Sequence, residues 1–195
     1  MMRSKFAWLP LAAVALGCMV TGTAQAQDAT SPPHYVYAGV DYAFLRSSLS
    51  KDSMKNALGG DQFDSDFYLL RVGTRLFKQI SIEGRFGIKN ESGNSTDKVE
   101  TNQMYGIYIV PTGNLFHFLE VSAPIGYAHT KLENDNGSVK LNGMSFGLNF
   151  EVPIYVNAKS RIPDIRLSSG GTVYYAGRDS QTYGYQAGIR MDFKI

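Results

Sequence analysis

Charged residues recur within stretches of the sequence in which every second residue is apolar. In Ile80–Lys89, for example, Glu83 and Arg85 alternate with Ile82 and Phe86. Successive side chains of a β-strand point to opposite faces, so these charges would share the face opposite the apolar one. Nine residues occupy such positions: Asp41, Arg71, Arg75, Glu83, Arg85, Glu120, Glu151, Arg166 and Arg190.

The chemistry expected of these nine residues is ion pairing. The chain has eight such alternating stretches, and the interior of an eight-stranded barrel is just wide enough for side chains to fill it. Breaking a buried pair costs about 3–5 kcal/mol, so we expect these acids and bases to form a structural plug. A gated ion path is the alternative interpretation. Six of the nine are expected in the inner half of the barrel: Arg75, Glu83, Glu120, Glu151, Arg166 and Arg190.

A cation site is the other chemistry that the residue types allow. Asp61, Asp64 and Asp66 could supply oxygen ligands to calcium. They lack the spaced series of carboxylates that a calcium-binding loop uses, so a solvated loop is the favoured interpretation. We therefore expect no metal site, and no sequence feature indicates a cofactor.

Eight alternating stretches would have to position the charged residues. A tilted strand needs about nine to eleven residues to cross a bilayer. The pattern predicts an all-β, eight-stranded, antiparallel up-and-down transmembrane β-barrel. Pro124 cannot donate a hydrogen bond to a neighbouring strand, so a local distortion is expected there. The predicted strands are His34–Leu45, Ser65–Leu76, Ile80–Lys89, Met104–Val110, Phe116–Ala128, Val139–Val152, Asp164–Arg178 and Tyr183–Ile195.

The connections between these strands alternate in length. Three long polar loops are expected at Arg46–Asp64, Asn90–Gln103 and His129–Ser138, and short turns at Phe77–Gln79 and Pro111–Asn114. Long loops outside and short turns inside are typical of outer-membrane barrels. Aromatic residues on the apolar face would form two interfacial belts, whereas a soluble sandwich or lipocalin-like barrel would pack them in a core. The outer belt would contain Phe44, Tyr68, Tyr105, Tyr127, Tyr175 and Tyr183, and the inner belt Phe150 and Phe193.

The first 26 residues have the features of a secretory signal peptide. Arg3 and Lys5 precede an apolar stretch, and Ala24–Ala26 forms an A-x-A cleavage site. Cleavage there would leave a polar leader at 27–33 and a barrel domain at 34–195. It would also remove Cys18, the one cysteine, for which lipoprotein acylation is the alternative role, and bring the net charge from +2 to zero. A chain without net basic charge or a basic cluster is not expected to bind nucleic acid.

The last predicted strand carries a short motif of the form polar-x-Gly-x-x-hydrophobic-x-aromatic. Gln186, Gly188, Met191 and Phe193 fill it in order, and Lys194 and Ile195 follow the aromatic residue. With the signal peptide and eight alternating stretches, the mature chain resembles the small Gram-negative outer-membrane β-barrels, OmpA-like and OmpX-like. The resemblance implies a monomer in outer-membrane lipid and lipopolysaccharide, with periplasmic termini. It also implies delivery by periplasmic chaperones and recognition of the motif by the barrel assembly machinery.

The family resemblance implies a non-enzymatic role in envelope integrity or in surface interaction and adhesion. The alternatives are a narrow porin-like channel or small-molecule binder that uses the charged interior, a lipid A-modifying enzyme, and a soluble periplasmic ligand-binding barrel. Of the three histidines, His34 and His117 fall at the inner end and His129 near the outer rim. Thr130 and Lys131 follow His129, so the His-x-Ser pair of the lipid A deacylases is absent, and no catalytic residue is expected.

Overall fold

The computed structural model describes residues 35–58, 61–89, 100–116, 118–134, 137–156, 162–177 and 180–194. The predicted signal peptide (1–26), the leader (27–33) and His34 lie outside these ranges. One α-helix is present in the described part, α2 (Asp52–Leu58). The strands are β1 (Tyr35–Leu49), β2 (Gln62–Phe77), β3 (Ile80–Lys89), β4 (Glu100–Phe116), β5 (Leu119–Ser122), β6 (Ile125–Asn134), β7 (Gly137–Tyr155), β8 (Asp164–Ala176) and β9 (Ser180–Lys194).

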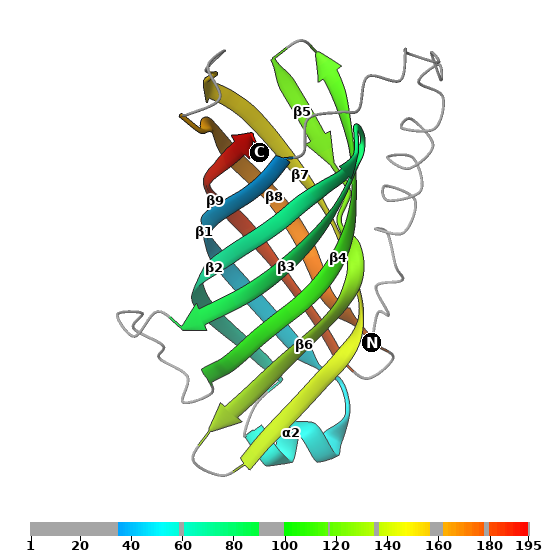
Figure 1. The fold of residues 1–195 in the computed structure, drawn as a ribbon. Coiled ribbons are helices and arrows are strands. Elements are labelled where there is room, and N and C mark those ends of the chain that lie inside the picture. The colour runs from blue at the N-terminus through cyan, green and yellow to red at the C-terminus, as the bar shows by residue number, and fades with distance from the viewer. Residues whose placement is uncertain are drawn as a thin grey trace. The chain divides into compact units, whose positions relative to one another are not determined.

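The strands form one antiparallel sheet that closes into a ring (Figure 1). The ring closes between β1 and β9, where Val40 lies opposite Ile189. β5 and β6 each pair with both β4 and β7, so the two short strands share one position in the ring. The nine strands therefore occupy eight positions, and the predicted up-and-down order is confirmed.

The break between β5 and β6 falls at Ala123 and Pro124, where a distortion was predicted. The Ala123 N–H donates to the Pro111 carbonyl at 2.9 Å, and the Pro124 carbonyl accepts from the Gly147 N–H at 2.9 Å. Proline has no N–H of its own, and these two bonds hold the break between the neighbouring strands. The position of the distortion is thus confirmed.

Alternation along each strand separates an apolar exterior from a mixed interior. Ile107 is 63% exposed and the next residue, Tyr108, is 2% exposed. Val72 on the exterior likewise follows Arg71, which is fully buried. Charges inside and apolar side chains outside are the arrangement of a barrel surrounded by lipid. No helix in the described ranges is both long enough and apolar enough to span a membrane.

Three connections predicted from polar composition are wrong. Most of Arg46–Asp64 is regular structure, because β1 extends to Leu49 and pairs with β2, and α2 fills the gap. The Pro111–Asn114 turn is instead part of β4, which continues to Phe116 opposite β5. His129–Ser138 belongs to the β6–β7 hairpin, in which Leu132 lies opposite Val139. In each case the inward residues continue the alternation among polar neighbours, so strand pairing persists.

One aromatic residue of the predicted outer belt has a different place. The register of β8 and β9 shifts between Val173 and Tyr175, as at a β-bulge. Tyr174 is buried in step with Thr172, and after the shift Tyr175 lies opposite buried Thr182 and packs against an internal apolar cluster. The extra residue of a bulge changes the face on which the following side chains lie. Tyr175 is therefore not a member of an external belt.

The interior contains two apolar clusters besides its charged residues. The first consists of Ala43, Leu45, Phe67, Leu69, Met104, Ala128 and Tyr174. The second lies under α2, which contributes Leu58 and Met54, and is otherwise made by Leu49, Phe63, Leu132, Val139 and Leu141. Figure 1 shows α2 at the end of the barrel opposite the end of β9. We call this the helix-capped end, and the other the terminal end.

Candidate functional site

Arg71 is the centre of one half of the charged interior. Its Nη2 lies 2.9 Å from Glu83 Oε2 and 3.2 Å from Glu151 Oε1, and its Nη1 lies 3.3 Å from Asp41 Oδ2. Glu83 also contacts Arg85, with 2.6 Å between its Oε1 and Nε. All five side chains are almost completely buried. Three other strands, β1, β3 and β7, thus bring inward carboxylates to the guanidinium of Arg71 on β2.

Arg190, on the last strand, is the centre of the other half. Arg190 contacts Glu151 through its guanidinium. Its Nη2 lies 3.2 Å from Glu120 Oε1, and its Nε lies 2.7 Å from Asp192 Oδ1. Glu120 also contacts Arg75 and Arg166, at 3.3 and 3.2 Å. Glu151 touches both Arg71 and Arg190, so it joins the two halves into one connected set.

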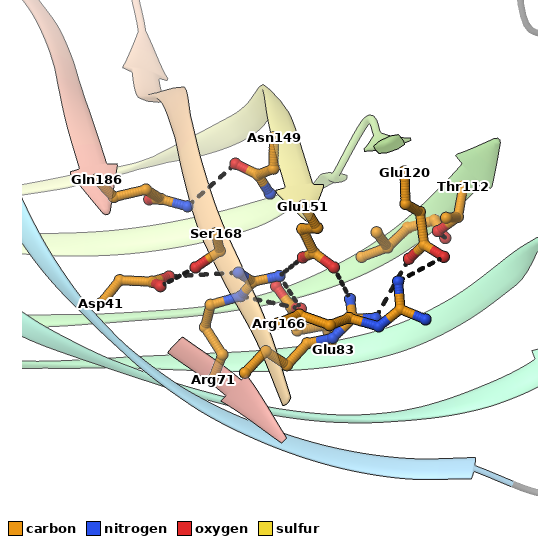
Figure 2. Close-up of polar contacts among 12 residues, drawn as sticks. Asp41, Arg71, Glu83, Thr112, Glu120, Asn149, Glu151, Arg166, Ser168 and Gln186 are labelled. Atoms are coloured by element: carbon orange, nitrogen blue, oxygen red, sulfur yellow. Dashed lines mark hydrogen bonds and ion pairs between the residues drawn. The ribbon is translucent and has the colours of Figure 1, made fainter. Parts of the chain in front are cut away.

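The structure places all nine predicted charged residues in this set, which we call the lumen network. Figure 2 shows Arg71, Glu83, Glu151, Arg166 and Glu120 pointing toward one another across the interior. The six residues expected in the inner half do not pair only among themselves, because Glu83 pairs with Arg71 and Arg85.

Asp192 is a tenth member that the sequence reasoning missed. It contacts Arg190 and also Arg166, whose Nε lies 3.0 Å from its Oδ2. Asp192 shares the inward face of the last strand with Arg190, so the alternation alone could have identified it. With Asp192 included, the lumen network contains five arginines and five carboxylates, which makes it neutral as a whole.

Two tyrosines stack on the guanidinium groups. The Tyr37 ring centre lies 4.7 Å from Arg190 Cζ, and the Tyr108 ring centre lies 4.5 Å from Arg85 Cζ. Such cation–π contacts add to the electrostatic stabilisation of a desolvated arginine. A Cβ at Gly73 would lie less than 3.0 Å from the Tyr37 ring, and one at Gly126 would lie less than 3.0 Å from the Ile107 carbonyl and from the Tyr108 ring. Inward glycines on adjacent strands are therefore the sequence signal that these rings needed room.

Uncharged polar groups complete the contacts of the network. Ser168 Oγ donates to Asp41 Oδ1 at 2.5 Å, and Arg85 Nη1 donates to Thr172 Oγ1 at 3.1 Å. Such hydrogen bonds give partners to carboxylate oxygens and guanidinium N–H groups that the ion pairs do not use. Buried polar groups without a partner would be costly. Nothing in the sequence pattern distinguished Ser168 or Thr172 from other small inward residues.

The four residues of the predicted assembly motif lie on both faces of β9. Gln186 is buried and accepts a hydrogen bond from Tyr174 Oη at 2.9 Å, and Gly188 packs against Asp41. Met191 and Phe193 are exposed on the outer face. Two of the four thus contribute to the interior of the folded barrel, whatever their role in its assembly.

The aspartates considered for calcium do not form a cluster. Asp64 forms a two-bond ion pair with Arg46, at 2.7 and 2.8 Å, near the helix-capped end. The hydrogen bond from Arg46 holds the pKa of the Asp64 carboxyl below its ordinary value. Within the described residues, no three His, Cys, Asp or Glu side chains are grouped so that they could hold a metal ion.

His129 lies on the outer face of β6, away from the lumen network. Its Nδ1 is hydrogen-bonded to Asn142 Oδ1, and its ring stacks on Tyr105 with 4.6 Å between ring centres. Tyr105 meets the face of the ring and Asn142 is an amide, so neither of these two neighbours is a nucleophile hydrogen-bonded to the histidine. His34 and His117 lie outside the described residues.

Comparison with known proteins gives the same fold. Residues 12–194 match a family model described as outer membrane protein beta-barrel domain. Ail, the attachment invasion locus protein of Yersinia pestis, solved with the heparin analogue sucrose octasulfate, superposes with a TM-score of 0.56 at 12% identity; the match covers 83% of this chain and 100% of Ail. The N-terminal β-barrel domain of Pseudomonas aeruginosa OprF gives 0.51 at 12% identity, over 80% of this chain and 97% of that domain. No curated protein matches the sequence.

Proposed function

Because the chain belongs to the outer membrane protein beta-barrel domain family, we propose that it is a non-enzymatic integral barrel with a closed interior. Its role is envelope integrity or surface interaction, and not transport. The signal peptide exports it, the terminal end faces the periplasm, and the helix-capped end faces outward. It works as a monomer in outer-membrane lipid and lipopolysaccharide, placed there by periplasmic chaperones and the barrel assembly machinery, without a cofactor or nucleic acid.

The composition of the interior carries this proposal. An ion on its way through would meet the neutral lumen network, whose charges are already paired, and then two apolar clusters. Separating one buried pair leaves a stranded charge at a cost of about 3–5 kcal/mol. A permanently open path is therefore disfavoured, and the surface of the barrel is left as its functional part.

The helix-capped end supports a role in surface interaction. It carries mixed charges, including Arg46, Asp64, Lys131 and Glu133. Ail, which has the same fold, is named for attachment and was solved with a heparin analogue. We include polyanion binding among the surface roles to test, although the charges here have both signs.

Conductance across a planar bilayer tests the closed interior. The refolded protein is expected to give no conductance steps, while heat-dependent gel mobility verifies that it is folded. Regular steps from the folded protein would overturn the closed-barrel proposal in favour of a narrow channel. The variant Leu58→Ala, which loosens the cap but leaves the lumen network intact, should also be silent.

Incubation with lipopolysaccharide tests the non-enzymatic part. Among the described residues, the hydrogen-bond partner of His129 is an amide and not a nucleophile, so the lipid should keep its mass after incubation with folded protein. Loss of an acyl chain, detected by mass spectrometry, would show a lipid A-modifying enzyme instead.

A further inference from the structure

A groove of about 830 Å³ crosses the outer face of the barrel over β2, β3, β4 and β6. These strands lie side by side on one side of the barrel in Figure 1. The floor of the groove is Gly84, which occupies an outward position between Ile82 and Phe86 on β3. The walls are apolar side chains of the neighbouring strands, among them Val72 and Ile107. The absence of a side chain at Gly84 therefore leaves a groove between apolar side chains on the outer face of the barrel.

The groove ends in polar groups toward the helix-capped side. Tyr105, His129 and Asn142 lie opposite one another on β4, β6 and β7, and all three line the groove. His129 Nδ1 and Asn142 Oδ1 are hydrogen-bonded, which fixes the edge of the ring that faces β7. Tyr105 stacks on the ring and fixes its plane.

Two lysines lie one step beyond His129 on the same outer face. Lys131 on β6 is directly opposite Lys140 on β7. Like charges directly opposite on adjacent strands are destabilising, and an anion between them would remove that cost. Lys131 also contacts Glu133, with 2.8 Å between Nζ and Oε2, which offsets only one of the two positive charges.

We propose that this groove binds a phosphorylated, multiply acylated glycolipid of the lipid A type. One acyl chain lies over Gly84, and a phosphate lies between Lys131 and Lys140, beyond the ring of His129. The two lysines lie just beyond the end of the apolar groove, and we call them its cationic mouth. A groove of this kind fits a lipid with a net negative head group better than a zwitterionic phospholipid. The inference rests on the proposed function, because the helix-capped end must face the outer leaflet for the two to meet.

The test is a titration of the folded protein in detergent with lipid A, followed by native mass spectrometry. Gly84→Leu fills the floor, and a Cβ there meets Phe86 at an ordinary 3.4 Å, so the barrel should fold. Its matched control is Gly171→Leu, an outward glycine on β8 whose added Cβ has 3.7 Å of room. We expect one saturable lipid A per barrel, weakened at least tenfold by Gly84→Leu and less than twofold by Gly171→Leu.

A second pair of variants tests the cationic mouth. Lys131→Ala with Lys140→Ala should weaken lipid A binding about as much as Gly84→Leu. Lys51→Ala with Lys55→Ala, which removes the same charge near α2, should not. Equal affinities of all four variants would overturn the site. Phosphatidylglycerol that binds the groove as tightly as lipid A would overturn the glycolipid assignment.

Failure of the proposed function gives a different result. If the protein conducts, or does not fractionate with the outer membrane, the proposed function is wrong whatever the groove variants do. A barrel that does not conduct, that fractionates with the outer membrane and whose lipid A affinity is the same in every variant would overturn only the proposed lipid A site in the groove.

Discussion

Arg190 shows how much one side chain can connect in a narrow interior. It contacts Glu120, Glu151 and Asp192, and Tyr37 stacks on it. Each of these carboxylates is buried and lies within ion-pairing distance of Arg190. Removal of Arg190 therefore leaves negative charge that the remaining side chains do not balance.

We predict that Arg190→Ala destabilises the barrel far more than Ile189→Ala does. The first change strands buried carboxylates, at a cost of about 3–5 kcal/mol. The second trims a side chain that is 45% exposed on the outer face and that detergent can replace. Urea unfolding of both variants in the same detergent measures the difference, and equal midpoints would contradict the structural role of the lumen network.

Arg46 and Asp64 give a contrasting, exposed ion pair. The pKa of Asp64 is lowered in the folded protein, so the pair stabilises the fold above the ordinary pKa of an aspartate. That contribution is lost as the pH falls through the lowered value. Both side chains are more than 40% exposed, so solvent and salt screen the effect and it is small.

The second prediction concerns this pair. In Arg46→Gln the Asp64 carboxyl should titrate nearer its ordinary pKa, and the titration should lose its dependence on salt. Carbon-detected NMR of the carboxyl follows both. An unchanged pKa in Arg46→Gln would show that the ion pair does not form in solution.

At the scale of elements, α2 is the feature that the sequence least suggested. Its seven residues lie in a stretch of Ser, Lys, Asp and Gly that reads as a loop. The helix is held by the burial of Leu58 and Met54 on the second apolar cluster. A helix this short is not stable by itself, so tertiary packing decides its existence.

The third prediction tests this cap. Leu58→Ala removes a side chain that is 2% exposed, which in a protein core costs about 2–5 kcal/mol. Here the loss should open α2 locally and leave the ring of strands intact. Hydrogen exchange of residues 52–58 should accelerate, with exposed Asn56→Ala as the control. Faster exchange throughout the barrel would instead show that the cap is part of one cooperative unit.

Strand faces could be predicted from the sequence, whereas strand ends could not. Alternation placed Asp41, Arg71 and Glu83 inside because side-chain direction depends only on parity along a strand. Lys131 and Glu133 in β6 have the composition of a loop, yet their strand continues past the apolar band. Hydrogen bonding to the next strand does not depend on side-chain polarity, so composition carried no signal.

Individual partners in the lumen network were also beyond the sequence. Whether a residue is at an odd or even position in its strand predicts the face on which its side chain lies. It does not predict the position of that side chain along the barrel axis, which depends on strand register and tilt. The bulge before Tyr175 changes the face on which the following side chains lie, and no residue type in the sequence indicates that a bulge is present. The contact of Glu83 with Arg71, and not with residues expected at its own level, is a consequence of that missing information.

For the molecule as a whole, closure of the ring depends on the seam between β1 and β9. Gly188 lies at this seam, and a Cβ there would fall less than 3.0 Å from the Val40 carbonyl and from Asp41. Backbone atoms cannot move aside as a flexible side chain can. The same glycine belongs to the predicted assembly motif, so two roles coincide at one position.

The fourth prediction separates these roles. Gly188→Ala should reduce the fraction that refolds from urea into detergent micelles, where no assembly machinery is present. Gly171→Ala, whose added Cβ would make only ordinary contacts at 3.7 Å or more, should refold like the parent. Normal refolding of Gly188→Ala, together with poor insertion in cells, would assign the glycine to recognition and not to closure.

The hub position of Arg190 also has a consequence for the order of events in folding. The residue comes from the last strand, yet its partners Glu120 and Glu151 precede it by 70 and 39 positions. Contacts between distant positions form late, because the intervening chain must first be ordered. Until β9 pairs with β1 the ring is open, so water can reach these two carboxylates and the interior around them. Loss of water from the interior and pairing of β1 with β9 would then occur in a single event. The arrival of the final strand would be the step that commits the chain to the folded barrel.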